Sequence, residues 1–298
     1  MSLIAPVIDL DRAPAKINLA LHVVGQREDG YHLLESLVVF TRFADRVTVG
    51  RAEADQFAVT GPYASAIPTD EGNLVLKARD ALRAALPQGA DFPVSISLEK
   101  NLPPASGIGG GSSDAATTLK GLTRLWEIDE ALLPEIGLSL GADVPMCLSP
   151  HPALVSGIGE KVERLPGFPP LFVVLVNPGV EMPTPAVFSR LGKKNNPGLE
   201  RPVPGGCEAL YAWLGETRND LEAPALELAP VIGETLEALR STQPFFVRMS
   251  GSGATCFALY GTSREAEAAA AHIRRVRPDW FVMATGSFAG SGEEHGGN

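Results

Sequence analysis

Apolar and polar positions alternate along residues 14–24, the first regular pattern in the chain. Every odd position from Ile17 to Val23 is aliphatic, whereas Lys16 and Asn18 fall on even positions. A period of two is typical of a strand with one buried face. The pattern therefore predicts a strand over residues 14–24, with Lys16 and Asn18 on the same face.

A polar turn with glycine at both ends, residues 25–30, follows this strand, and residues 31–40 read as a second strand. A short glycine-containing turn between two strands predicts a hairpin, which places Tyr31 and His32 near its tip. Because a strand rises ~3.3 Å per residue, a ligand that reached from Lys16 to this tip would be long. Two amphipathic residues at a turn would also explain Tyr31 and His32 without any ligand.

Helical and strand patterns are mixed through the rest of the chain, which indicates a mixed α/β protein with two regions. Asn73 is predicted to cap a helix, Ser112 or Ser113 another, and Thr262 with Glu265 forms a capping box for a third. Further strands are predicted at residues 46–50, 56–61, 93–98, 171–177 and 280–288 and on both sides of 250–254, and helices at 74–85, 112–126, 129–140 and 262–276.

Composition excludes several classes of protein. The 298 residues are 45% hydrophobic and 20% charged with a net charge of −10, so no broad basic field for nucleic acid exists. No apolar run approaches the ~18 residues of a membrane span. The three cysteines, at 147, 207 and 256, form neither a metal spacing nor a disulfide framework, which fits a reducing cytoplasm.

The stretch with most chemistry is Pro103-Pro-Ala-Ser-Gly-Ile-Gly-Gly-Gly-Ser-Ser-Asp-Ala-Ala116, between a predicted strand and a predicted helix. Exposed N–H groups of glycines at a helix N-terminus form an anion site, and phosphate is the obvious anion. A P-loop is excluded because no lysine follows before Lys120, and the dinucleotide fingerprint fails because its sixth position is Ser112. A flexible surface loop is the competing interpretation.

This stretch resembles the second motif of the GHMP kinases (galactose, homoserine, mevalonate and phosphomevalonate kinases), and Ser250-Gly-Ser-Gly-Ala resembles their third. The similarity runs from about residue 13 to 288. It is greatest to the branch that uses ATP to phosphorylate the 2-hydroxyl of 4-diphosphocytidyl-2-C-methyl-D-erythritol, on the non-mevalonate route to isoprenoid precursors.

The resemblance implies an α/β (α+β) two-domain fold with the active site in the cleft between the domains. An N-terminal ATP-binding domain is expected over residues 1–157 and a C-terminal ferredoxin-like substrate domain over 158–298. Residues 289–298 are predicted to be a disordered tail.

The same resemblance implies site residues. Lys16 and Asp143 would be catalytic, Asp143 accepting or positioning the hydroxyl proton; local backbone capping is the alternative for Asp143. Ser112 or Ser113 would contact Mg²⁺. The substrate would be bound by Asn18, Tyr31, His32, Lys100 and Phe188. ATP would be bound by Asn73, Lys100, Pro103, Pro104, Ala105, Ser106, Gly107, Ile108, Gly109, Gly110, Gly111, Ser112, Ser113 and Asp114.

Some features stay open at this point. Ala105 and Ser106 stand where the family often has glycine, which bears on ATP affinity. Phe188 would stack on cytosine, or else be a core residue at a helix start. A GHMP kinase for another small alcohol, a nucleotide-binding regulator and a dinucleotide-dependent oxidoreductase are the rival functions; neither nucleic acid, membrane nor an obligate protein partner is expected.

Overall fold

The protein is described by a computed structural model that covers residues 7–86, 92–202 and 205–290. Its contacts define two compact units. Unit 1 comprises Met1–Ala15, Ala44–Pro104 and Gly109–Ser149, and unit 2 comprises Lys16–Phe43, Ala105–Ile108 and Pro150–Asn298. These units interleave along the chain, so the sequential division at residue 157 stays a prediction. Residues 291–298 of the expected tail lie outside the described residues.

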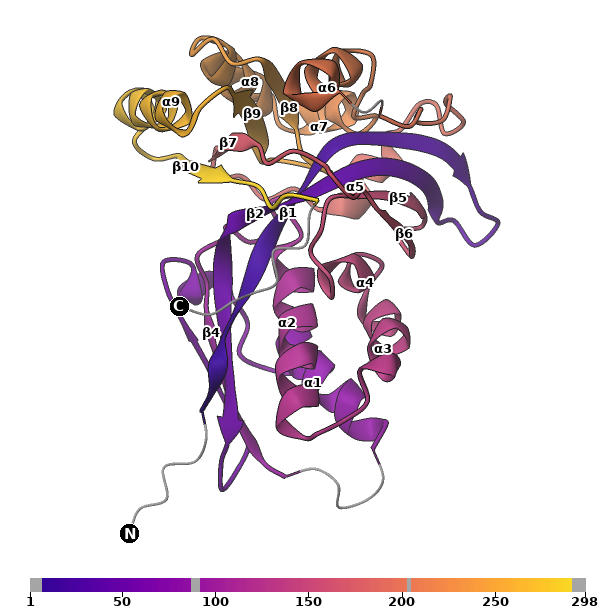
Figure 1. Cartoon of the computed structure of the whole chain (residues 1–298), viewed down its shortest axis with the longest axis vertical. Coiled ribbons are helices and arrows are strands. Elements are labelled where there is room, and N and C mark those ends of the chain that lie inside the picture. Colours follow the sequence, from indigo (N-terminus) through magenta and orange to yellow (C-terminus); the bar gives the residue numbers. More distant parts are fainter. Residues whose placement is uncertain (1–6, 87–91, 203–204, 291–298) are drawn as a thin grey trace. The chain divides into compact units, whose positions relative to one another are not determined.

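Two long paired strands, β1 (Val7–Gln26) and β2 (His32–Arg51), run through both units (Figure 1). The predicted hairpin is confirmed: the Arg27 amide donates to the Tyr31 carbonyl at 2.7 Å across the turn. The prediction of a separate strand at 46–50 is wrong, because these residues are the end of β2. No glycine or proline interrupts residues 41–45, so nothing stops the strand there.

In unit 1, β4 (Val94–Glu99) lies between β3 (Gln56–Thr60), to which it is parallel, and the end of β2, to which it is antiparallel. Val94, Ile96 and Leu98 alternate with Ser95 and Ser97, and only the aliphatic set is buried, as a sheet with one covered face requires. The helical segments of this unit are η1 (Ala64–Ala66), α1 (Leu74–Ala84), α2 (Gly110–Leu125), η2 (Glu130–Leu132), α3 (Leu133–Leu140) and α4 (Val144–Cys147).

The starts of these helices differ from the predictions in two places. Helix α2 begins at Gly110 with Gly109 as its N-cap at φ +65°, so the prediction that Ser112 or Ser113 caps it is wrong; a left-handed glycine turns the chain earlier. The helix expected over 129–140 is split into η2 and α3, and Leu132, at the end of η2, is exposed. Asn73 does cap α1, accepting from the Val75 amide at 2.9 Å.

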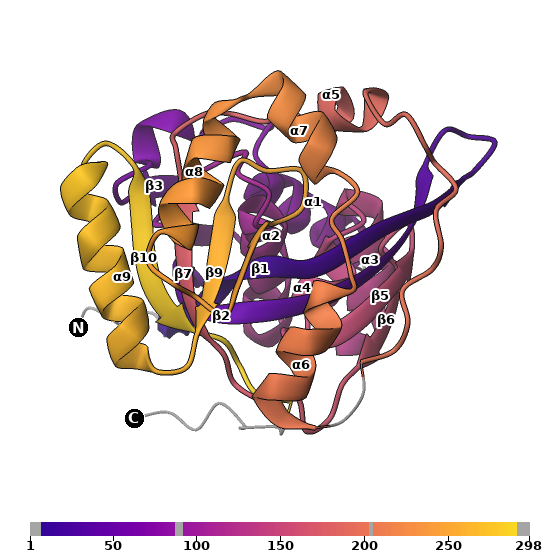
Figure 2. The same cartoon turned by 90° about the horizontal axis from the view of Figure 1, so that it is seen from above.

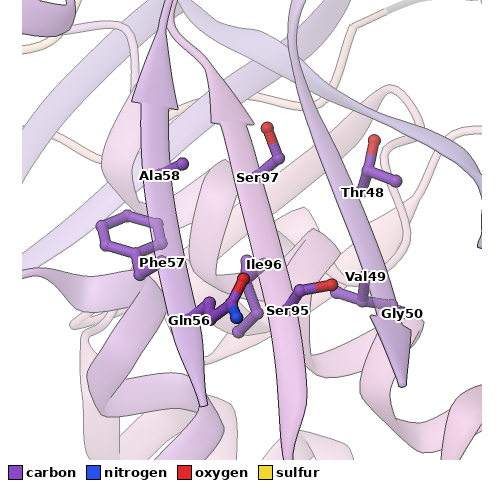
Figure 3. A pocket seen from close by; sticks show the side chains of 9 residues that line it. All are labelled: Thr48, Val49, Gly50, Gln56, Phe57, Ala58, Ser95, Ile96 and Ser97. Atoms are coloured by element: carbon purple, nitrogen blue, oxygen red, sulfur yellow. The ribbon is translucent and has the colours of Figure 1, made fainter. Parts of the chain in front are cut away.

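A shallow pocket of about 290 Å³ lies on the sheet of unit 1 and opens between residues of three neighbouring strands (Figure 3). Its lining consists of uncharged side chains: Thr48, Val49, Gly50, Gln56, Phe57, Ala58, Ser95, Ile96 and Ser97. A phosphate site needs cations or clustered N–H donors. The lining of this pocket offers no cation, so we do not assign it to the predicted reaction.

In unit 2, the start of β2 pairs with β5 (Ala153–Gly157), which forms a hairpin with β6 (Lys161–Arg164). Sequence analysis missed this hairpin because the two strands are short and lie among glycines and prolines. The second sheet has the order β10-β7-β9-β8 and is antiparallel throughout. Its strands are β7 (Phe172–Asn177), β8 (Phe246–Met249), β9 (Cys256–Tyr260) and β10 (Phe281–Gly286).

This second sheet has the connectivity of a ferredoxin-like fold, as predicted. Its first and third strands are central, and helices connect the first strand to the second and the third to the fourth. Helices α8 and α9 pack on the sheet (Figure 2), where Val174, Val176, Ala258 and Ile273 belong to one buried cluster. The helices of unit 2 are α5 (Thr184–Ser189), α6 (Gly206–Gly215), α7 (Glu222–Leu228), α8 (Val231–Arg240) and α9 (Ser263–Val276).

The capping box predicted for α9 is present, with Thr262 and Glu265 bonded reciprocally to each other's backbone N–H groups. None of the helices in the described ranges is both long and apolar enough to cross a membrane.

Candidate functional site

The glycine-rich loop is divided between the units: Pro103, Pro104 and residues 109–114 belong to unit 1, and residues 105–108 to unit 2. In unit 1, the Ser113 amide donates to the Gly109 carbonyl at 2.9 Å, which closes the first turn of α2. Ser112 is half-buried, and Ser113 is fully buried. The first turn of α2 thus brings both serines to the helix N-terminus, the end where anions bind.

A buried charge cluster lies behind this turn. The Lys100 ammonium donates to a carboxylate oxygen of Asp45 and, at 2.7 Å, to one of Asp114. The Asn101 and Leu102 amides also donate to Asp45. Lys100 is 2% exposed, so in this structure its ammonium is used to join β2 and α2 to the end of β4.

The electrostatics of the cluster follow from its burial. Burial raises the pKa of Asp114 to about 7, although the Lys100 ammonium lowers it. The pKa of Lys100 is itself raised because the two carboxylates outweigh the effect of burial. The cluster therefore holds one lysine charge between two carboxyl groups, of which Asp114 binds a proton more readily than usual.

Two buried oxygens in this region make no hydrogen bond within the described residues: Ser113 Oγ and Asp114 Oδ1. Buried polar atoms are normally paired. A hydroxyl and a carboxylate oxygen are the hard donors that Mg²⁺ prefers, so the residues here fit the predicted metal. Among the described residues, no group of three or more His, Cys, Asp or Glu side chains forms a metal cluster.

In unit 2, the other part of the loop contacts the second glycine-rich segment directly. The Thr255 amide donates to the Ser106 carbonyl at 3.1 Å, and Ser250 Oγ donates to the Gly107 carbonyl at 3.2 Å. A Cβ on Gly107 would lie 2.6 Å from the Ser250 carbonyl oxygen. Because that distance is shorter than any side chain tolerates, position 107 must be glycine for the two backbones to meet.

The middle of β1 is joined to the same segment. The Lys16 amide donates to the Ile108 carbonyl at 2.8 Å, and the Asn18 amide donates to Ser250 Oγ at 3.0 Å. The side chains of Lys16 and Asn18 share a face, as predicted, and the Lys16 ammonium donates to Asn18 Oδ1 at 3.0 Å. Asn18 Nδ2 in turn donates to Ser36 Oγ. Both residues are buried, so a solvated lysine on an exposed strand face is excluded.

Near the hairpin tip, His32 and Phe188 stack with ring centroids 4.7 Å apart and planes 26° apart. Burial, with the nearby Lys194 charge, lowers the pKa of His32, which keeps the imidazole neutral at pH 7. His32 Nε2 is buried and makes no hydrogen bond to the described residues. Tyr31 is 58% exposed. The structure thus brings His32 and Phe188 together.

Asn73 and Asp143 are two further predicted residues of unit 1. Asn73 caps α1 and also donates to the Pro68 carbonyl, so its capping role is confirmed. Asp143 occupies the N-cap position of α4 and is half-buried, and its side chain makes no N-cap hydrogen bond to that helix.

Comparison with known proteins bears on the identity of this site. The family model for the GHMP kinases N terminal domain matches residues 73–150, and that for the GHMP kinases C terminal region matches residues 208–279. The 4-diphosphocytidyl-2-C-methyl-D-erythritol kinase of Mesorhizobium japonicum is 55% identical over 94% of this chain and 96% of its own length. The enzyme of that name from Rhizobium etli is 50% identical over 94% and 95%.

The chain belongs to the family of 4-diphosphocytidyl-2-C-methyl-D-erythritol kinases, within the GHMP kinases.

Solved structures agree with this family. A crystal structure of a 4-(cytidine 5'-diphospho)-2C-methyl-D-erythritol kinase is 34% identical, with a TM-score of 0.76 over 94% of this chain and all of that one. A homoserine kinase from Cytophaga hutchinsonii shares the fold, with a TM-score of 0.64 at 18% identity over 93% of each chain. The chain is accordingly an ATP-dependent phosphotransferase of the GHMP fold.

Sequence reasoning missed several residues that build this kinase site: Asp45, Ser36 and the bridging role of Ser250. Asp45 follows apolar residues in a strand, where a buried carboxylate gives no periodic signal. Ser36 lies within a long hydrophobic strand in the same way. Their roles depend on partners far away in sequence, which spacing alone does not reveal.

Proposed function

We propose that this chain transfers the γ-phosphoryl group of ATP to the 2-hydroxyl of 4-diphosphocytidyl-2-C-methyl-D-erythritol, giving the 2-phosphate and ADP. The observation that carries the proposal is the hydrogen bonding of the residue 106–108 backbone to both the Ser250 hydroxyl and the middle of β1. It joins the phosphate loop to the strand that bears Lys16 and Asn18. A cytoplasmic location on the non-mevalonate route to isoprenoid precursors goes with this proposal.

The loop binds the ATP phosphates through its N–H groups and the N-terminus of α2. Gly107 and Gly109 both have positive φ, so backbone amides on either side of Ile108 are unshielded by side chains. A loop of this kind at the start of a 16-residue helix supplies a fixed partial positive charge. Pro103 and Pro104 restrict the loop, and in this proposal Asn73 lies near the adenine as well as capping α1.

Mg²⁺ is held by Ser112 or Ser113 together with phosphate oxygens in this proposal. When bound, the ion supplies positive charge that neutralises the phosphates during transfer. Ser113 Oγ and Asp114 Oδ1, which have no hydrogen-bond partner among the described residues, support an oxygen-coordinated cation in this region. Exchange of each serine for alanine, with Mg²⁺ affinity measured by titration, separates the two candidates.

Lys16 and Asp143 act on the reacting hydroxyl. Asp143 accepts its proton or orients it, and Lys16 stabilises charge that develops on the transferred group. Asn18 accepts from the Lys16 ammonium and is itself fixed by Ser36 and Ser250, which supports a Lys16 held in one orientation. Lys16 and Asp143 belong to different units, so their pairing is part of the proposal.

The cytidine end of the substrate binds at His32 and Phe188, with Tyr31 beside them. An aromatic ring can stack on a base, and a neutral imidazole whose buried Nε2 has no partner in the described part of the chain can hydrogen-bond to it, so the two can together recognise a pyrimidine. Lys100 has a structural role in this proposal, not a binding one. Its burial between Asp45 and Asp114 favours a role in holding the start of α2 over direct contact with substrate.

The test is consumption of ATP by the purified protein with Mg²⁺, with and without the cytidine substrate. Wild-type turnover should depend on that substrate, and the Asp143→Asn variant should lose about 10²-fold or more in kcat. Asp129→Asn is the matched control, because Asp129 in the same unit only caps η2. Turnover with homoserine, mevalonate or a sugar in place of the cytidine compound would overturn the substrate, and full activity of Asp143→Asn would overturn its role.

A further inference from the structure

The glycine segment at the end of β8, residues 249–253, contacts the phosphate loop through backbone atoms and through the Ser250 hydroxyl. Ser250, Gly251 and Gly253 all approach Gly107 closely: a Cβ on Gly107 would lie 2.7 Å from the Gly253 carbonyl oxygen, and one on Gly251 would lie 2.7 Å from the Gly107 carbonyl oxygen. Backbone-to-backbone packing has little tolerance for displacement. Whatever fixes residues 249–253 therefore fixes residues 106–108 as well.

Asn219 fixes residues 249–253 through its side chain. Its amide group donates to the Met249 carbonyl at 2.9 Å and to the Gly251 carbonyl at 2.8 Å, and its oxygen accepts from the Leu221 amide at 3.0 Å. The side chain is 7% exposed. All the polar atoms of the Asn219 side chain are thus used within the protein, and both of its donor bonds end on this glycine segment.

The backbone around Asn219 is tied to β1. The Leu21 amide donates to the Arg218 carbonyl and the Asp220 amide donates to the Leu21 carbonyl, both at 2.9 Å. Asn219 is consequently paired with Leu21, on the strand that carries Lys16 and Asn18. Its amide links that strand to the glycine segment, and Ser250 Oγ links the segment back to Asn18 and Gly107.

We propose that Asn219 is a positioning residue for nucleotide binding, which holds residues 249–253 in the arrangement that residues 106–108 of the phosphate loop require. Asn219 touches neither ATP nor substrate in this proposal. The inference rests on the proposed function in that the loop is taken to bind ATP. Its neighbour Asp220 faces a different partner set, since it accepts from the Val23 amide, Asn196 and Arg218.

The experiment measures equilibrium binding of ATP and of the cytidine substrate separately, by calorimetry, for the wild type and for Asn219→Asp. This variant keeps the shape and the acceptor but replaces two donors with an oxygen that faces two carbonyl groups. ATP binding should weaken at least tenfold while binding of the cytidine substrate changes less than twofold. A merely structural loss would weaken both or lower only the melting temperature, and either result would overturn the proposal.

Two controls and a second variant keep the test decisive. Asn195→Asp, at an exposed position in the same unit, and Asp220→Asn, next to Asn219, should each leave ATP affinity within twofold. If Asn219→Asp does not fold, Asn219→Ser replaces it, because serine removes the same two long-range donors without adding a charge. This variant too should weaken ATP binding while leaving binding of the cytidine substrate nearly unchanged. Loss of ATP affinity in Asp220→Asn as large as in the Asn219 variant would contradict the assignment.

A double-variant cycle tests whether Asn219 acts through the glycine segment. Ser250→Ala removes the link from that segment to Gly107 and Asn18. If both residues act on one element, the double variant should bind ATP within about twofold of the weaker single variant, because residues of one network are not additive. If the double variant instead loses ATP affinity by the product of the two single losses, Asn219 does not act through Ser250. Because ATP binding is read directly, a wild type that binds ATP but does not phosphorylate the cytidine compound would refute the proposed substrate alone.

Discussion

The Lys100 ammonium lies 2.7 Å from a carboxylate oxygen of Asp114, with both side chains almost wholly buried. Asp45 is the second acceptor and is completely buried. Lys100 comes at the end of β4 and Asp114 lies in the second turn of α2, on the two sides of the glycine loop. The pair therefore fixes the spacing between the loop's entry and its exit.

The Lys100→Met variant should be severely destabilised. Methionine keeps the length of the side chain but leaves two buried carboxyl groups without their cation, and breaking a buried pair in this way costs about 3–5 kcal/mol. The free energy of unfolding, measured by urea denaturation, should fall by that amount. Lys77→Met, at an exposed position of α1, is the control and should change it by less than about 0.5 kcal/mol.

Asp114→Asn should be far milder than Lys100→Met. Burial already raises the pKa of Asp114 to about 7, so an uncharged side chain suits this position, and Asp45 remains as counter-ion. We expect a loss below about 1.5 kcal/mol, the net value of a typical hydrogen bond. If Asp114→Asn and Lys100→Met lower the free energy of unfolding equally, both carboxylate charges are needed and an uncharged side chain does not suit position 114.

Stability at acid pH should depend on Asp55. Arg83 donates to both of its oxygens, at 2.6 and 3.1 Å, and the Val94 amide donates to one at 2.9 Å. These bonds lower the pKa of Asp55 to about 2. Because the folded carboxylate binds a proton less readily than the unfolded one, its stabilisation is complete above about pH 4 and is lost as the pH falls towards about 2.

The Asp55→Asn variant should therefore lose less stability than the wild type between about pH 4 and pH 2. Urea unfolding at several pH values in this window measures the difference. Glu71→Gln, at an exposed position outside any ion pair among the described residues, should keep the wild-type slope. Parallel curves for wild type and Asp55→Asn would refute the linkage.

Ala105 has a strained backbone conformation. Its φ is +46°, a left-handed conformation that costs an L-residue about 1–2 kcal/mol. Ala105→Gly removes this cost. It also increases the conformational entropy of the unfolded chain, which lowers the free energy of unfolding by about 0.4–1 kcal/mol. The melting temperature should stay unchanged or rise slightly. Ala81→Gly, within α1, has the opposite sign and should lose about 1 kcal/mol; a comparable loss in Ala105→Gly would contradict the strain.

Local patterns were sufficient for most of the elements. The alternation at residues 17–23, the capping residues Asn73 and Thr262 and the glycine-flanked turn before Tyr31 each depend on neighbours in sequence, and the structure confirms them. The start of α2 was placed two or three residues late, because a left-handed Gly109 competes with serine as a cap. Short strands such as β5 and β6 carried too few residues for a pattern.

The contacts of the site could not be read in the same way. The glycine motif indicated phosphate binding, but the contact between Gly107 and Ser250 joins residues 143 positions apart. The partnership of Lys100 with Asp45 spans 55. Such pairings are set by how strands and loops pack, so the sequence identified candidate side chains without revealing which of them hold one another.

The stack of His32 on Phe188 predicts how the cytidine end is recognised. Base stacking on an aromatic side chain is worth about 1–3 kcal/mol. If cytosine binds at this stack, Phe188→Leu keeps an apolar side chain but removes the aromatic face. KM for the cytidine substrate should rise about 5- to 150-fold, the equivalent of that energy. KM for ATP should not change, since the phosphate loop lies elsewhere in the sequence and makes no contact with Phe188 among the described bonds.

Phe172→Leu is the matched control for this prediction. Phe172 lies in β7 of the same unit and is 38% exposed, so its loss removes an aromatic ring of equal size without touching His32. Steady-state kinetics with each substrate varied in turn separate the two KM values. An unchanged KM for the cytidine compound in Phe188→Leu would assign Phe188 to the apolar core, where it also packs. A parallel rise in both KM values would mean that the change had spread from this stack to the phosphate loop.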